Sequence, residues 1–170
     1  MLVVVSGLPG VGKSAVAAAV AARLGAVHLS IDSTEDALLG AGLPAGYGTG
    51  VAAYEAVRAA AEHNLMLGRT VVVDAVNDSE PARETWRRAA GAAAAGLVFV
   101  VLSLGDRGEH RRRLTGRVRD LAHVLEPSWD DVERRAANSD PWRGRDVLPV
   151  EAGGALDDVV ERVVAVVTIA

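Results

Sequence analysis

The feature that most constrains this chain is the stretch "GLPGVGKS" (7–14), which follows the apolar run "MLVVVS" almost directly. It satisfies the pattern G-x-x-x-x-G-K-[ST] in the context that the pattern requires, after a strand and at the start of a helix. Glycines at 7, 10 and 12 let backbone N–H groups turn inward around a phosphate without Cβ clashes. The motif therefore predicts that the chain binds a nucleoside triphosphate, but it does not specify a reaction.

Within this loop, we expect Lys13 to bridge the β- and γ-phosphates and Ser14 to ligate Mg²⁺. Lys13 is the only lysine among the 18 Lys and Arg residues, although a GC-rich genome would also produce such a bias. The positive N-terminal end of the following helix adds to the attraction for phosphate. The residues expected to hold the nucleotide are Gly7, Leu8, Pro9, Gly10, Val11, Gly12, Lys13, Ser14 and Ala15.

Length and composition set broad limits. A chain of 170 residues is expected to form one domain, 1–170, with a sizeable core. No apolar run approaches the roughly 18–20 residues of a membrane span, and there is no cysteine for a disulfide or a thiolate metal site. The net charge of −4 does not favour nucleic acid as a partner. We therefore expect a cytoplasmic protein that binds neither membrane nor nucleic acid, and leave monomer and homodimer open.

The hydrophobic pattern alternates between strands and helices along the chain. We expect the helix at 51–67 to bury Val51, Tyr54, Val57, Ala61 and Leu65 on one face, after a glycine-rich loop at 40–50. The expected strands are 2–6, 27–31, 70–75, 97–104 and 146–151, and the other expected helices are 13–24, 33–39, 80–94, 128–138 and 156–167. This alternation predicts an α/β fold with a mostly parallel sheet covered on both faces, whose ligands bind at the carboxyl ends of the strands.

Two classes of nucleotide protein fit poorly. A GTP switch usually selects guanine with an Asn-Lys-x-Asp segment, which a chain whose one lysine lies in the loop cannot contain. An ATPase motor usually places a glutamate after the aspartate that ends a strand, whereas Asp74 in "VVVDAVN" is followed by Ala75. A small kinase remains, and it must position an acceptor, neutralise charge on the phosphoryl group and exclude water.

Two acidic residues at predicted strand ends are candidates for this chemistry. Asp32 could accept the proton of an acceptor hydroxyl as a general base, although with Glu35 it also matches a helix-capping box. Asp74 could hold Mg²⁺ through water or orient Ser14. Asn77 could touch the acceptor or simply form a turn.

An arginine-rich segment follows the fourth strand. Arg113 and Arg117 are four residues apart, so on a helix they would share a face and could close over the β- and γ-phosphates as a lid. The alternatives are a solvated basic face paired with Glu109 and Asp120, or a nucleic-acid patch, which the scarcity of nearby aromatic residues disfavours. The predicted catalytic residues are Lys13, Asp32, Arg113 and Arg117, and Arg113 is also expected to contact the nucleotide.

With these residues identified, the chain resembles the small P-loop kinases of the AAA_33, or "predicted kinase", type. This group is related to chloramphenicol phosphotransferase, zeta toxins, gluconate kinase and polynucleotide kinase domains. The resemblance rests on "GLPGVGKS", "LSIDSTEDALL", "AAYEAV", "VVVDAVN", "HRRRLTGRVRD", "PSWDDVERR" and "DPW". It implies a P-loop NTPase three-layer sandwich with a five-stranded parallel sheet of order 2-3-1-4-5, ATP with Mg²⁺ as donor, and an arginine-rich lid at about 105–127.

One departure from these relatives concerns the acceptor. Several of them carry Asp-x-x-Arg after the second strand, the arginine helping to bind an anionic acceptor, whereas here Asp32 is followed by Glu35. The resemblance therefore implies a phosphotransferase acting on a neutral or cationic hydroxyl compound, such as a sugar, nucleoside, aminocyclitol or antibiotic. Tyr47, Tyr54 and Glu55 are expected in its pocket. A polynucleotide 5′-hydroxyl or nucleotide kinase, or a non-catalytic ATP-binding module, remains the alternative.

Overall fold

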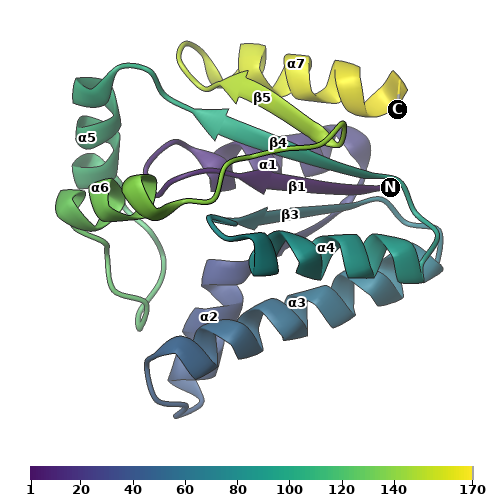
Figure 1. Cartoon of the computed structure of the whole chain (residues 1–170), viewed down its shortest axis with the longest axis horizontal. Helices are drawn as coiled ribbons and strands as arrows, with labels where there is room; N and C mark the ends of the chain where they lie inside the picture. Colours follow the sequence, from purple (N-terminus) through teal and green to yellow (C-terminus); the bar gives the residue numbers. More distant parts are fainter. Residues whose placement is uncertain (170) are drawn as a thin grey trace.

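The computed structural model describes residues 1–169, which form a five-stranded sheet between two layers of helices (Figure 1). The strands are β1 (Leu2–Ser6), β2 (Val27–Ser30), β3 (Val71–Ala75), β4 (Leu97–Ser103) and β5 (Val147–Glu151). Their order is β2-β3-β1-β4-β5, and all neighbouring pairs are parallel. The predicted fold class and strand order are confirmed.

The helices divide between the two faces of the sheet and its carboxyl edge, as Figure 1 shows. One face packs against α1 (Lys13–Leu24) and α7 (Leu156–Ile169), and the other against α3 (Tyr47–Met66) and α4 (Glu80–Ala92). Beside α3 lies α2 (Ile31–Gly40), whereas α5 (Arg107–Gly116) and α6 (Trp129–Asn138) stand at the edge where the strands end.

The side chains of β1 alternate strictly between the two faces of the sheet, which explains why helices cover both faces. Every residue of β1 is buried, with Val3 and Val5 in the core under α1 and α7 and Leu2 and Val4 in the core under α3 and α4. Side chains of a strand point alternately to its two faces, so a wholly apolar strand requires a helical layer on each side. The register pairs Ser6 with Ala75, the last residue of β3, and with Val101, near the end of β4, so the chain leaves β1 at the carboxyl edge of the sheet.

The start of α3 differs from expectation. The helix begins at Tyr47 rather than at 51, because Thr49 donates a hydrogen bond from Oγ1 to the Pro44 carbonyl at 2.6 Å and stabilises the glycine-rich first turn. The buried stripe runs through Thr49, Ala53 and Val57, and Val51, two residues from either neighbour in the stripe, is 42% exposed. The expectation that Val51 is buried was wrong. Along residues 1–169, no helix combines the length and apolarity needed to cross a membrane.

Candidate active site

The phosphate-binding loop runs from the end of β1 to the start of α1, packed between β4 and α5. At Gly7, with φ of 143°, a Cβ would lie 2.6 Å from the carbonyl oxygen of Leu102. At Gly10, with φ of 90°, a Cβ would lie 3.0 Å from the Cβ of Leu114. Glycine is therefore required at both positions, for backbone conformation and for space.

The flanking loop residues have distinct surroundings. Val11 is buried in the core beneath α1, and Leu8 packs against the same cluster, so both contribute backbone rather than side chain to the loop surface. Ser14 and Ala15 are exposed in the first turn of α1. Their N–H groups are those that a helix leaves without intrahelical partners, which makes this end suitable for an anion.

Lys13 lies at the centre of a group of charges. Its Nζ donates a hydrogen bond to the Leu8 carbonyl at 3.1 Å. The pKa of Lys13 is lowered to about 8, chiefly by burial. The carboxylates of Asp32 and Asp74 act in the opposite direction, and the guanidinium groups of Arg117 and Arg119 add to the lowering. The tertiary structure therefore brings two carboxylates and two arginines within electrostatic range of the loop lysine.

Two of the arginines form one ion-pair network above this lysine. Arg117 lies 2.6 Å from Glu126, measured from Nη2 to Oε2, and Arg119 also pairs with Glu126. Arg119 further donates from Nη1 to Oδ2 of Asp32 at 2.6 Å. Within the described chain, the buried Nη2 of Arg119 has no hydrogen-bond partner. Such a donor is available to an additional anionic oxygen.

Arg113 occupies a different position from Arg117. Helix α5 ends at Gly116, and Arg117 is extended, with φ of −73° and ψ of 143°. The prediction that Arg113 and Arg117 share a helical face was therefore wrong, because a glycine of low helix propensity ends the helix between them. Arg113 instead donates to Glu109 at 2.9 Å and to the Ala152 carbonyl at 3.0 Å. It still lies beside the loop, since a Cβ on Gly12 would be 4.0 Å from its Nη1.

Asp32 lies in the first turn of α2 and faces Arg119. The N-cap of α2 is Ser30, whose hydroxyl accepts a hydrogen bond from the Ser33 N–H at 3.4 Å. The alternative that Asp32 and Glu35 form a capping box was therefore wrong. Oδ2 of Asp32 bonds to Arg119, whereas Oδ1 has no hydrogen-bond partner among residues 1–169.

Asp74 is buried at the end of β3. Its Oδ1 accepts from the Ser30 hydroxyl at 3.0 Å, and its Oδ2 lies 3.2 Å from Nε2 of His28, a histidine for which sequence reasoning proposed no role. The side chains of Ser14 and Asp74 both offer oxygen, the donor that Mg²⁺ prefers. Among residues 1–169, no group of three or more His, Asp or Glu side chains is arranged so that it could hold a metal ion by itself.

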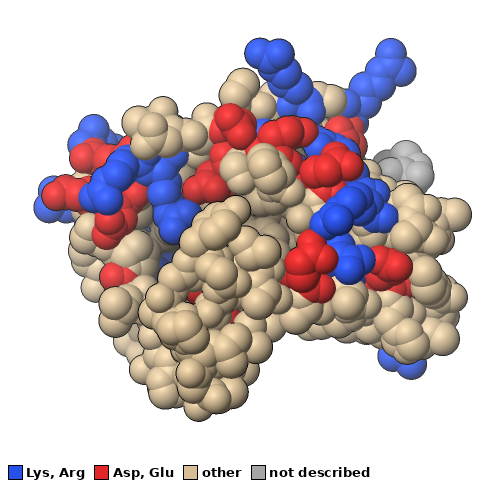
Figure 2. Space-filling view, turned by 60° about the horizontal axis from the view of Figure 1, so that its bottom comes forward, with Lys and Arg blue, Asp and Glu red and all other residues tan. Residues whose placement is uncertain are grey.

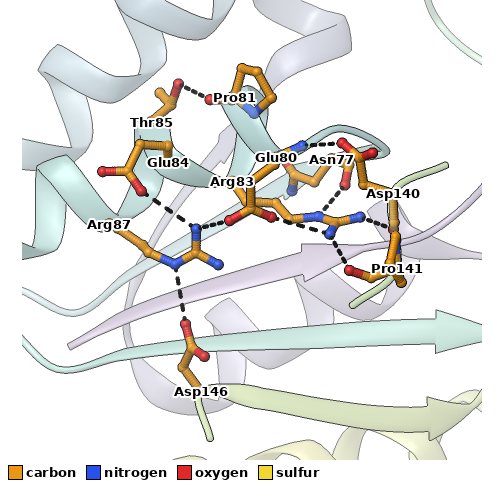
Figure 3. A network of polar contacts seen from close by, with 10 residues as sticks. All are labelled: Asn77, Glu80, Pro81, Arg83, Glu84, Thr85, Arg87, Asp140, Pro141 and Asp146. Carbon is orange, nitrogen blue, oxygen red and sulfur yellow. Dashed lines mark hydrogen bonds and ion pairs between the residues drawn. The ribbon is translucent and has the colours of Figure 1, made fainter. Parts of the chain in front are cut away.

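Asn77 has a structural place, which decides between the two roles considered for it. The residue is buried with φ of 55°; its Nδ2 donates to Ser6 Oγ at 2.8 Å and its Oδ1 accepts from Trp86 Nε1 at 2.8 Å. Its carbonyl accepts from buried Arg83, which also donates to the carbonyls of Asp140 and Pro141 (Figure 3). The buried Asn77 side chain thus joins β1 to α4, and both ends of its amide are engaged in structural hydrogen bonds.

His110 on α5 is a second contact that sequence reasoning missed. Its Nε2–H donates to the carbonyl of Pro9 at 2.7 Å, and its buried ring packs edge-on against Trp129 at 5.1 Å between centroids. This hydrogen bond connects the phosphate-binding loop, at Pro9, to α5. No local spacing signals such a contact, because 101 residues separate the partners.

A cavity of about 620 Å³ opens beside Asp32, between α2, the start of α3 and the start of α4. Tyr47, Tyr54 and Glu55 line it, as expected from the sequence. Burial raises the pKa of Tyr54 far above its usual value, and its hydroxyl accepts from the Asn77 N–H. Figure 2 shows the lobe of α2 and the start of α3 almost entirely tan, beside a dense mixture of blue and red over α5 and α6.

Comparison with known proteins agrees with this geometry. Residues 2–138 match the model of the AAA_33 family, described as an AAA domain. No curated protein sequence matches the chain. Three solved structures are similar over most of their length and share the fold. A sugar kinase from Janibacter sp. is 15% identical with a TM-score of 0.74, and the match covers 99% of this chain and 95% of that one. A gluconokinase from Sinorhizobium meliloti is 23% identical with a TM-score of 0.69, and the match covers 98% of this chain and 91% of that one. The APS kinase of Mycobacterium tuberculosis in complex with AMPPNP and APS is 19% identical with a TM-score of 0.74, and the match covers 98% of this chain and 96% of that one.

Proposed function

The chain belongs to the AAA_33 family and has a kinase-like P-loop fold, and from this premise we propose that it is an ATP-dependent phosphotransferase. It moves the γ-phosphate of ATP·Mg²⁺ to a hydroxyl group of a small molecule such as a sugar, nucleoside or antibiotic. The observation that carries the proposal is the position of Asp32. Its carboxylate lies within electrostatic range of Lys13 and bonds to Arg119, and it also lines the cavity.

We assign a role in this reaction to the phosphate-binding loop, to Asp32 and to the arginines near them. The amides of loop 7–14 and the ammonium group of Lys13 bind the triphosphate. Oδ1 of Asp32 accepts the proton of the acceptor hydroxyl as the acceptor oxygen bonds to the γ-phosphorus. The bond from this phosphorus to the bridging oxygen breaks, and ADP leaves with that electron pair. Arg117 and Arg119 offset negative charge on the phosphoryl oxygens in transit.

Ser14 and Asp74 are the residues proposed to hold Mg²⁺, Asp74 through water. When bound, the ion neutralises charge on the β- and γ-phosphates. His28 and Ser30 keep the Asp74 carboxylate oriented, since each bonds to a different oxygen of it. Arg113, beside Gly12 and the loop after β5, is proposed to contact the nucleotide. Segment 105–127 is the proposed lid within a single kinase domain, 1–170.

The cavity favours this function over its alternatives. A polynucleotide or nucleotide kinase must accept an anionic acceptor, and the lining of this cavity is acidic. A non-catalytic ATP-binding module does not need a carboxylate with a free oxygen beside both an acceptor-sized cavity and the phosphate-binding loop.

The test is a screen for phosphoryl transfer to sugars, nucleosides and aminoglycosides, read as the mass increase of the acceptor. Asp32→Asn keeps the shape of the side chain and removes the base. We expect it to abolish transfer while ATP binding persists. Full transfer by this variant, or ATP binding without transfer to any acceptor by the unaltered protein, would refute the proposal.

A further inference from the structure

The cavity beside Asp32 has an excess of negative charge. Its walls carry four carboxylates but one guanidinium group, that of Arg135. Three of the carboxylates have arginine partners: Glu55 with Arg58 and Arg88, Asp78 with Arg135, and Asp32 with Arg119. The fourth, Glu35, forms no hydrogen bond or ion pair with any residue in the range 1–169. A cationic partner for Glu35 is thus missing from the described part of the protein.

Glu35 is placed to act together with Asp32. The two residues are three positions apart on α2, so their side chains project from the same face of the helix. The Glu35 carboxylate lies near the start of α3. A Cβ placed on Gly50 would be 3.8 Å from its Oε1. Partial burial raises the pKa of Glu35, the charge of Asp32 raises it further, and Arg135 opposes both. A raised pKa from these causes indicates that Glu35 is partly shielded from water and that nearby positive charge does not fully compensate its negative charge.

We propose, on the basis of the phosphotransferase function above, that the acceptor is a cationic amino compound, an amino sugar or aminocyclitol, whose ammonium group binds Glu35 while a hydroxyl group of the same molecule meets Asp32. Glu35 is then the residue that selects acceptors by their charge. Asp32 performs the chemistry one helical turn away.

The electrostatics distinguishes three classes of acceptor. An anionic acceptor would bring a like charge to a wall that already has too much negative charge, which costs binding energy. A neutral acceptor can donate hydroxyl hydrogen bonds to Glu35 in place of water, but it brings no positive charge to offset the carboxylate. An ammonium group supplies both the counter-charge and up to three hydrogen-bond donors. The rings of Tyr47 and Tyr54 line the same cavity and can attract a cation through their faces.

The size of the cavity fits this class. About 620 Å³ falls within the range of sites for drug-sized ligands and accommodates an acceptor of one or more rings. Figure 2 shows the lobe of α2 and the start of α3 almost free of blue, and the cavity lining carries one guanidinium group, that of Arg135.

The experiment compares glucosamine, glucose and glucuronate, three acceptors with a common ring that are cationic, neutral and anionic, together with kanamycin as a larger polyamine. The full-length protein is assayed for phosphoryl transfer from ATP to each. Glu35→Gln removes the charge at nearly constant shape, and Glu35→Asp retains it. Glu84→Gln makes the same change on the exposed surface of α4, away from the cavity, as the matched control. Thermal unfolding verifies that each variant is folded.

We expect kcat/KM to be highest for the amino acceptors and to fall about 10- to 100-fold for them in Glu35→Gln, mainly through KM. Activity on them should be partly retained in Glu35→Asp and unchanged in Glu84→Gln. Preference for glucose or glucuronate, or an amine preference that survives in Glu35→Gln, overturns this inference and leaves the proposed function standing. ATP binding with no transfer to any acceptor overturns the proposed function, and this inference with it.

Discussion

Asp32 and Arg119, 87 residues apart in the chain, are joined by a hydrogen bond of 2.6 Å from Nη1 to Oδ2. The first residue lies in the first turn of α2 and lines the cavity, and the second belongs to the segment between α5 and α6. Asp36 on the same helix strengthens this connection, because its carboxylate accepts from the N–H groups of His123 and Val124 at 2.7 and 2.9 Å. The segment after α5, which we propose as the lid, is thus anchored to α2.

The arginine network provides the first prediction. Arg119→Ala should lower turnover by about 100-fold or more, because it removes positive charge near the transferred phosphoryl group and a partner of Asp32. Arg117→Ala should have a similar effect. Steady-state kinetics with saturating ATP measures both. Arg111→Ala, at an exposed position on α5, is the control. Near-normal turnover in both variants would leave the network as surface charge.

A second prediction concerns the pH dependence of nucleotide binding. The pKa of Lys13 is lowered to about 8, and bound phosphates would raise it, so the complex holds more protons than the free protein above pH 8. ATP affinity should therefore be constant below pH 8 and fall above it, at most about tenfold per pH unit. Calorimetric titration between pH 7 and about pH 10 measures this. Lys13→Arg stays protonated over this range and should show no such decline. If ATP affinity falls equally with pH in the original protein and in Lys13→Arg, the decline does not come from the titration of Lys13.

The bond between His110 and Pro9 yields a third prediction. His110→Ala should weaken ATP binding and lower the free energy of unfolding by about 1–3 kcal/mol, because it removes a buried hydrogen bond and opens space against Trp129. Calorimetry and urea unfolding measure the two effects. His63→Ala changes an exposed histidine on α3 and should alter neither. If His110→Ala loses stability but keeps full ATP affinity, the bond does not position the loop.

Asn77 allows a fourth prediction, on stability alone. Asn77→Ala should lower the free energy of unfolding by about 2–4 kcal/mol, since it leaves the buried Trp86 N–H without an acceptor and places alanine at positive φ. Asn77→Gly relieves the backbone strain but not the lost bonds, so it should cost less than alanine yet remain destabilising. Urea unfolding of the three proteins separates the two contributions. A glycine variant as stable as the original would mean that the side-chain bonds contribute no more than the strain that glycine relieves.

Much of the fold follows from local patterns. Wholly apolar strands such as β1 require helices on both faces, and the glycines of loop 7–14 admit few backbone paths, so the sheet and the phosphate-binding loop were predictable. Asp32 and Asp74 were also identifiable, because parallel strands end at one edge and their polar neighbours gather there.

What the sequence by itself determined was therefore the class of fold, the nucleotide loop and the acids at the edge of the sheet, all of which depend on periodicity or on the conformation of a few consecutive residues. Only the tertiary structure decided that Arg119 reaches Asp32, that His110 holds Pro9 and that Glu35 faces the cavity without a cationic partner among residues 1–169. The physical reason is that the path of the chain after α5 depends on where Gly116 ends that helix and on long-range contacts made far along the chain. Spacing along the sequence carries no information about such contacts.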